Sequence, residues 1–130
     1  AERAGIWANV ADDTELCTFH LPSRVRRGAL QLSIGSAGEA PFVVRRLRQA
    51  MERLFGPEWA PWMGGAARFR QAVRGLSLSR SEQEARYDAF FEETVDPRTF
   101  KARVLTAAEE RSLLSAGMGA SDPVEGGGAR

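Results

Sequence analysis

The sequence predicts an α/β fragment in which a short apolar strand and a basic β-hairpin precede a mostly helical C-terminal part. Residues 6–11 are apolar and uncharged, which is typical of a strand buried in a parallel sheet. Apolar and polar residues alternate at 30–34, which predicts a strand with one solvent face. From residue 41 onward, apolar residues recur at the spacing of amphipathic helices.

The composition is that of a globular domain. The chain has 130 residues, 43% of them hydrophobic and 27% charged, which excludes wholesale disorder. Cys17 is the only cysteine, so no internal disulfide can form and a reducing cytoplasm is the expected compartment. No apolar run approaches the roughly 20 residues that span a bilayer, and we expect no membrane partner. Because the chain does not begin with Met, and residues 1–5 resemble the end of a helix entering a strand, we expect a fragment that lacks its N-terminal part.

Two adjacent carboxylates, Asp12 and Asp13, follow the strand predicted at 6–11. Ligands of open α/β sheets bind beyond the carboxyl ends of the strands, so the pair is a candidate site. One Asp could instead cap a helical turn predicted at 14–16. The two interpretations are compatible because two carboxylates are available.

Arginine dominates the positive charge of the chain. It accounts for 17 of the 18 basic residues. Residues 24–53 contain seven arginines but only two glutamates. This local excess of five positive charges attracts anions such as phosphates and carboxylates. A merely solvated surface is the alternative interpretation. The seven are Arg24, Arg26, Arg27, Arg45, Arg46, Arg48 and Arg53.

A basic hairpin and a glycine loop follow the carboxylates. Strands are expected at 19–21 and 24–27, with a break at Pro22 and a turn at 27–29, before the strand at 30–34. The loop Gly35-x-x-Gly38 leads into a helix that begins at Pro41. Such a loop can hold an anion on backbone N–H groups, although an ordinary turn has the same signature. The dinucleotide motif G-x-G-x-x-G is absent from the chain.

Helical patterns occupy the rest of the chain up to residue 116. The helix predicted at 41–55 has an apolar stripe of Val43, Leu47, Ala50, Met51 and Leu54. A pattern from Trp59 to Leu76 is interrupted at Pro61 and at Gly64-Gly65. Ser81 and Glu84 form a candidate capping box, Asp96-Pro97 is expected to begin a short helix through Val104, and residues 107–116 predict another. The tail at 117–130 is too poor in apolar residues to order itself.

With these motifs identified, the chain resembles the N-terminal module of siroheme synthases, the precorrin-2 dehydrogenase and sirohydrochlorin ferrochelatase family. The resemblance covers about residues 1–100. The matching segments are Asn9-Val10-Ala11-Asp12-Asp13, Phe19 to Pro22-Ser23, Ser33-Ile34-Gly35-Ser36-Ala37-Gly38-Glu39-Ala40-Pro41, Arg45-Arg46-Leu47-Arg48 and Ala89-Phe90-Phe91.

The resemblance implies a division into four parts. Residues 1–16 would be the last strand and end of an NAD-binding Rossmann domain, and 17–56 a β-hairpin and helix dimerisation region. Residues 57–105 would be a helical domain, and 106–130 a short helix with a disordered tail. The glycine-rich nucleotide loop of the family is not in this chain, so NAD would be bound mainly by a missing N-terminal part.

The resemblance also implies roles for single residues. Asp12 would be the catalytic carboxylate of both reactions, Ser36 a loop serine that faces the substrate, and Asn9 a contact of the cofactor. The substrate is a polycarboxylate tetrapyrrole, which Arg24, Arg26, Arg27, Arg45 and Arg46 would bind, since guanidinium pairs with carboxylate through two hydrogen bonds. Ala37 and Glu39 depart from the family pattern. His20 is interpreted as packed or partly exposed, and no resident metal site is expected.

The function implied is NAD-dependent dehydrogenation of precorrin-2 to sirohydrochlorin in siroheme biosynthesis, by an enzyme of which this fragment alone would be inactive. Whether iron insertion is a second activity stays open, and Fe²⁺ would then be a substrate. A homodimer is expected. The alternative is a non-enzymatic helical module that binds nucleic acid through its arginines; a net charge of +1 and the lack of a reading motif argue against it.

Overall fold

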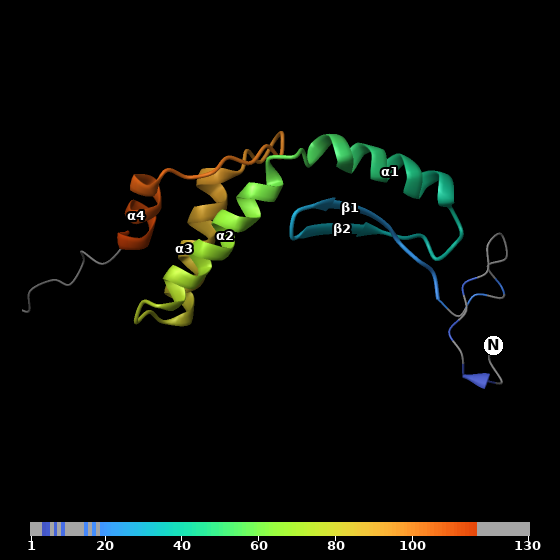
Figure 1. The fold of residues 1–130 in the computed structure, drawn as a ribbon, viewed down its shortest axis with the longest axis horizontal. Coiled ribbons are helices and arrows are strands. Elements are labelled where there is room, and N and C mark those ends of the chain that lie inside the picture. Colours follow the sequence, from blue (N-terminus) through green and yellow to red (C-terminus); the bar gives the residue numbers. More distant parts are fainter. Residues whose placement is uncertain are drawn as a thin grey trace, which may run out of the picture.

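The computed structural model describes residues 4, 5, 7, 9, 15, 17 and 19–116. Most of the strand predicted at 6–11, both members of the carboxylate pair and the tail at 117–130 lie outside the described residues. Figure 1 shows two arms that meet near the middle of the molecule, one formed by a β-hairpin with a helix and the other by three helices.

The first arm is built on an antiparallel hairpin of β1 (Ser23–Arg27) and β2 (Leu30–Ile34). Gly28 supplies the positive φ of +60° that the turn needs. Val25 pairs with Leu32 and is only 2% exposed, because α1 (Pro41–Leu54) covers that face of the hairpin. The hairpin confirms the strand predicted at 30–34. Residues 19–21, in contrast, form no strand within the described part of the chain.

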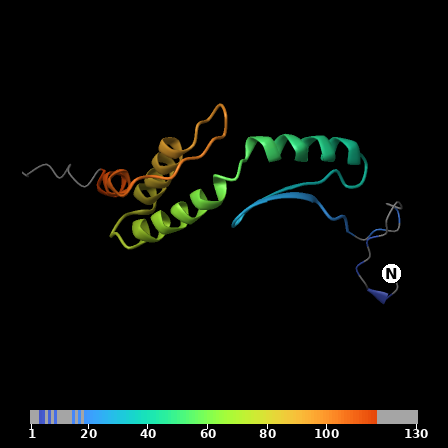
Figure 2. The same cartoon turned by 45° about the horizontal axis from the view of Figure 1, so that its top comes forward.

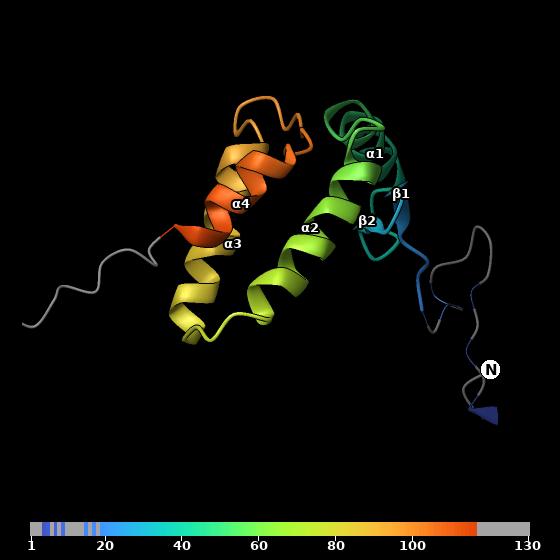
Figure 3. The ribbon, with the colours of Figure 1, turned by 60° about the vertical axis from the view of Figure 1, so that its left-hand side comes forward.

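The second arm packs three helices around an aromatic core. They are α2 (Trp59–Arg74), α3 (Arg80–Thr94) and α4 (Ala107–Ser115), which lie side by side in Figure 3. α2 runs without a break through Gly64-Gly65, contrary to the expected interruption, and Pro61 lies in its first turn, where a missing N–H costs nothing. The buried core consists of Trp59, Trp62, Phe69, Val73, Phe90 and Val95.

Buried polar groups in this arm are paired. The Trp62 indole N–H donates to the Thr94 hydroxyl (2.9 Å), which donates to the Phe90 carbonyl (2.6 Å). Arg86 on α3 is 7% exposed, and its guanidinium donates to the carbonyls of Leu114 (3.3 Å) and Ala116 (2.7 Å) at the end of α4. Since a buried donor without an acceptor costs about 1–3 kcal/mol, these bonds fix how α2, α3 and α4 pack.

Two further local predictions in this arm are wrong. The capping box of α3 uses Ser79 and Glu82, two residues before the predicted pair. The helix expected from Asp96 is absent: the Asp96 carboxylate accepts the N–H groups of Arg98 (2.7 Å) and Thr99 (3.1 Å) and closes a turn. Phe100 then has a φ of +54°, and Ala102 pairs with Val95 in a β-bridge. The side-chain hydrogen bonds compete successfully with helical ones.

The two arms meet at the hairpin turn and at the end of α1. A Cβ atom at Gly28 would lie 3.2 Å from Ala60 of α2, so the turn approaches that helix closely. The Phe55 ring packs on Trp59 and Phe100, with centroids 5.1 and 5.6 Å apart. The angle between the arms is therefore set by packed side chains.

Candidate anion-binding site

The segment before the hairpin is anchored by one hydrogen bond. Asn9 donates its side-chain N–H to the carbonyl of Phe19 at 3.0 Å, and the Trp7 and Phe19 rings meet edge to face at 6.0 Å. These contacts bring the chain on either side of the carboxylate pair together. Asp12 and Asp13 themselves lie outside the described residues.

The glycine loop between β2 and α1 is a turn closed by its serine. The Ser36 hydroxyl accepts the N–H of Ala40 (3.1 Å), and the Ser36 carbonyl accepts the N–H of Glu39 (3.0 Å). Ala37 and Gly38 both have positive φ, +52° and +83°. The hydroxyl thus holds the start of α1, while its own proton stays available to a ligand.

Arg27 and Arg48, two of the seven clustered arginines, are engaged within the protein. The Arg27 guanidinium donates to the carbonyls of Phe55 (2.7 Å) and Glu52 (3.2 Å), so it holds the C-terminal end of α1 against the hairpin. Arg48 forms an ion pair with Glu52 at 2.9 Å.

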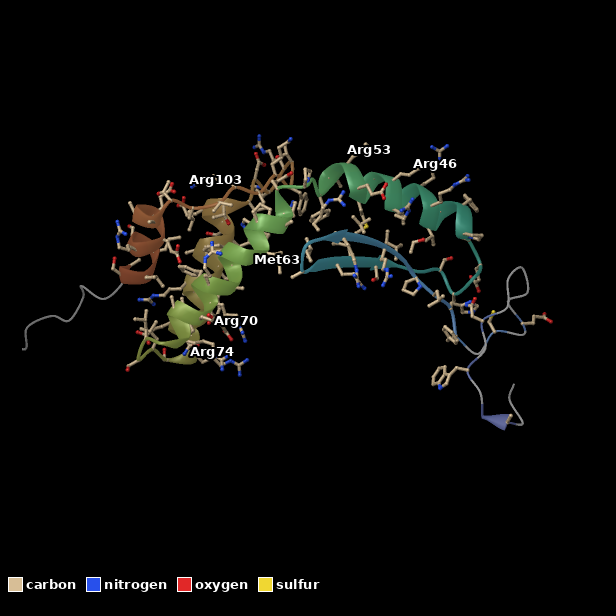
Figure 4. All side chains as sticks on the ribbon, viewed as in Figure 1. Arg46, Arg53, Met63, Arg70, Arg74 and Arg103 are labelled. Carbon is tan, nitrogen blue, oxygen red and sulfur yellow. The ribbon has the colours of Figure 1, made fainter. Side chains whose placement is uncertain are left out.

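The remaining arginines of the cluster lie on two different surfaces. Arg24 and Arg26 alternate with the buried Val25, so they project from the hairpin face opposite α1. Arg45, Arg46 and Arg53 are exposed on α1, and Figure 4 shows Arg46 pointing away from the hairpin. The structure therefore does not bring the predicted arginines into one continuous patch.

Two arginines that sequence reasoning did not select lie on α2. Arg70 and Arg74 are exposed and one helical turn apart, and α2 contains no acidic residue. The signal that could have found them is this spacing in a helix without carboxylates.

A cavity of about 430 Å³ opens where α3 ends, between Glu92 and Arg103. Three of the charged residues that line it, Glu93, Asp96 and Arg103, interact within the protein. Arg103 pairs with Glu109 at 3.1 Å and with Glu93 at 3.9 Å. Hydrogen bonds from the backbone N–H groups of Arg98 and Thr99 lower the pKa of Asp96. The cavity is therefore a weaker candidate for binding an anion than the exposed arginines.

No group of three or more His, Cys, Asp or Glu residues among the described positions could hold a metal ion. His20, interpreted from the sequence as packed or partly exposed, is exposed. None of the helices described has the length and apolar character needed to cross a membrane.

Comparisons with known proteins confirm the resemblance found in the motifs. A siroheme synthase of Nitrosomonas europaea is 39% identical over 74 residues, which are 57% of this chain and 16% of that protein. One from Neisseria meningitidis serogroup B is 34% identical over 83 residues, 64% of this chain and 17% of that protein. One from Methylobacillus flagellatus is 29% identical over 119 residues, 92% of this chain and 26% of that protein. No family model matches the chain.

The fold is also found in a solved structure. The chain is similar to SirC, described as a precorrin-2 dehydrogenase, with a TM-score of 0.60, 19% identity, and coverage of 82% of this chain and 50% of SirC. At this identity the match shows the fold alone, and it confirms the predicted α/β fragment with a hairpin followed by helices. The chain spans about a sixth to a quarter of its curated relatives and half of SirC.

Proposed function

We propose that this chain is the part of a siroheme synthase-type enzyme that supplies the catalytic carboxylate and substrate-binding arginines for the dehydrogenation of precorrin-2. The observation that carries the proposal is the 39% identity to a siroheme synthase over 74 residues. The exposed hairpin arginines support it, because a tetrapyrrole with several carboxylates needs positive charge around its rim. The compartment proposed is the cytoplasm.

NAD is proposed to bind outside this chain. A dinucleotide fold needs a strand, a glycine-rich turn and a helix N-terminus, and the described residues contain no such unit. The only glycine loop described between a strand and a helix, at 35–38, follows a hairpin strand and is closed by Ser36. Asn9 stays a proposed cofactor contact, although its amide already donates to Phe19.

The chain's own residues would then bind the substrate and take up a proton. Asp12 is proposed as the base, since a carboxylate beside positive charge stays ionised and accepts a proton. Ser36, with its hydroxyl proton available, and the exposed Arg24, Arg26, Arg45 and Arg46 are proposed substrate contacts. Arg27 enters the proposal as the residue that holds α1 on the hairpin.

The test is the pair of substitutions Asp12→Asn and Asp13→Asn in the full-length protein that contains this chain. Asp12→Asn should lower the rate of precorrin-2 dehydrogenation by about 10²–10⁴, the contribution of a general base. Asp13→Asn, the matched control, should cost about 1 kcal/mol of stability or less and keep most of the activity. The rate is followed through NADH absorbance, and circular dichroism checks folding.

Each other outcome has a definite meaning. Loss of activity only in Asp13→Asn would assign the two carboxylates in reverse. Near-normal activity in both variants would contradict a catalytic role for the pair. A wild-type protein without dehydrogenase activity would contradict the proposed function itself.

A further inference from the structure

The hairpin turn meets α2 at a corner of the molecule. Gly28 approaches Ala60 so closely that an added Cβ would lie 3.2 Å from it. From this contact the hairpin and α2 diverge, as Figures 1 and 2 show, with α1 on the far side of the hairpin. The corner is thus bounded by the solvent face of the hairpin and by one stripe of α2.

The hairpin side of the corner is basic and polar. Arg24 pairs with Ser33 across the strands, and Arg26 pairs with Gln31. All four side chains project from the face that α1 leaves open, because they alternate with the residues that face α1. Neither strand nor the turn between them contains a carboxylate.

The α2 side carries its own pair of arginines. Ala60, Met63, Ala67, Arg70 and Arg74 are three or four residues apart in turn, so they lie along one stripe of the helix. Since Ala60 contacts the hairpin turn, the whole stripe faces the corner. Figure 4 shows Met63, Arg70 and Arg74 on that side of α2. With 1.5 Å of rise per residue, Arg70 lies about 15 Å along the axis from Ala60.

The four arginines of the corner lack acidic partners. Within the described part of the chain, ion pairs neutralise Arg48, Arg80 and Arg103, all of them elsewhere. Arg26 donates only to the neutral Gln31 amide, at 3.3 Å. The corner therefore holds four exposed guanidinium groups around a floor of small or apolar side chains, Met63 and Ala67.

We propose that this corner binds the carboxylates of the tetrapyrrole substrate, with Arg70 and Arg74 on α2 acting together with Arg24 and Arg26 on the hairpin. The inference rests on the proposed function and adds to it the two α2 arginines. A flat macrocycle suits the site because its rim presents carboxylates in several directions, which two separated arginine pairs can bind. Its apolar faces would cover Met63 and Ala67.

The experiment measures binding of uroporphyrin I, a stable octacarboxylate porphyrin, to this 130-residue chain through quenching of tryptophan fluorescence. Three double variants each remove two positive charges: R24Q/R26Q, R70Q/R74Q and the control R98Q/R111Q. The control residues are exposed and lie outside the corner, on the turn after α3 and on α4. Each corner variant should raise the dissociation constant about tenfold or more, and the control about twofold or less.

Unchanged binding by R70Q/R74Q, or equal weakening in all three variants, would overturn the inference, since the latter indicates only long-range attraction. A duplex DNA competitor tests the other class of polyanion. Displacement of uroporphyrin by equimolar DNA, with DNA binding lost in the same corner variants, would also overturn it. These results are independent of the dehydrogenase assay, whose failure in the wild-type protein would contradict the proposed function rather than the corner.

Discussion

Ala37 adopts a φ of +52° in the loop that begins α1. An L-residue with a Cβ pays about 1–2 kcal/mol in this region, whereas glycine does not. The neighbouring Gly38, at +83°, also has a positive φ but does not carry that cost. The loop that carries Ser36 is therefore held in place against local strain.

We expect Ala37→Gly to stabilise the protein by about 0.5–1 kcal/mol. Relief of strain exceeds the entropy that glycine adds to the unfolded chain. The free energy of unfolding, measured by urea titration, checks this. Ala29→Gly is the matched control in the hairpin turn, because Ala29 is not among the residues with positive φ. It should be neutral or destabilising, and a destabilising Ala37→Gly would contradict the argument.

The start of α3 depends on a reciprocal pair of hydrogen bonds. The Ser79 hydroxyl accepts the N–H of Glu82 at 3.3 Å, and the Glu82 carboxylate accepts the N–H of Ser79 at 2.7 Å. Hydrogen bonds with Ser79, from the side chain first and the backbone second, lower the pKa of Glu82. A lowered folded-state pKa adds stability above the unfolded pKa, and this is lost as the pH falls through the folded pKa.

We expect Ser79→Ala to cost about 1 kcal/mol at neutral pH. Ser81→Ala, the serine favoured by the sequence pattern, should change stability by less than about 0.5 kcal/mol. The difference between wild type and Ser79→Ala should shrink as the pH falls through the lowered pKa of Glu82, because the protonated carboxyl is a weaker acceptor for the Ser79 N–H. Urea titrations over a series of pH values from neutral to acidic measure this. Equal effects of the two substitutions would contradict the assigned cap.

For the helices and strands, local sequence patterns predicted most elements but not where they end. The alternation of apolar and polar residues predicted β2, and the helical spacing of apolar residues after Pro41 predicted α1. Ser81 and Ser79 both precede a glutamate by three residues, and the path of the chain from α2 decides between them. Asp96 followed by Pro97 favours a helix start, because the Asp side chain can accept backbone N–H groups. Hydrogen bonds of that kind can also close a turn, as they do here. Propensity cannot separate outcomes that depend on where the chain goes next.

The whole molecule exposes an apolar stripe on α1. The hairpin covers only part of that helix, and Val43, Leu47 and Leu54 remain 39%, 48% and 43% exposed. Among the described residues, no third strand pairs with the hairpin, and such open edges favour association with another strand. These features support the proposal that the chain dimerises through the region 17–56.

We expect sedimentation to show a dimer at high micromolar concentration. L47E/L54E should shift it to monomer, because charges would replace apolar contacts at the interface. Val104→Glu is the control, since Val104 is similarly exposed, at 49%, on the other arm. A wild-type protein that is monomeric throughout would contradict the proposal.

The distribution of charge over the molecule could not be read from the sequence. The run from Arg24 to Arg53 is dense in arginine. Folding places Arg24 and Arg26 on the hairpin face opposite α1, engages Arg27 in hydrogen bonds to backbone carbonyls, and engages Arg48 in an ion pair. Arg70 and Arg74 lie outside that run and join the hairpin face only because Gly28 brings the turn against Ala60. Local density along a chain says little about proximity in space once a hairpin and a helix fold over one another.

Arg86 has a practical consequence for anyone who shortens or extends this chain. Its buried guanidinium relies on the carbonyls of Leu114 and Ala116, which come from the last residues that the structure describes. A version that stopped before Leu114 would remove two of the three carbonyls that the guanidinium bonds and leave only that of Glu82, a loss of about 1–3 kcal/mol. Affinity tags, fluorescent reporters and fusion partners therefore belong beyond Ala116.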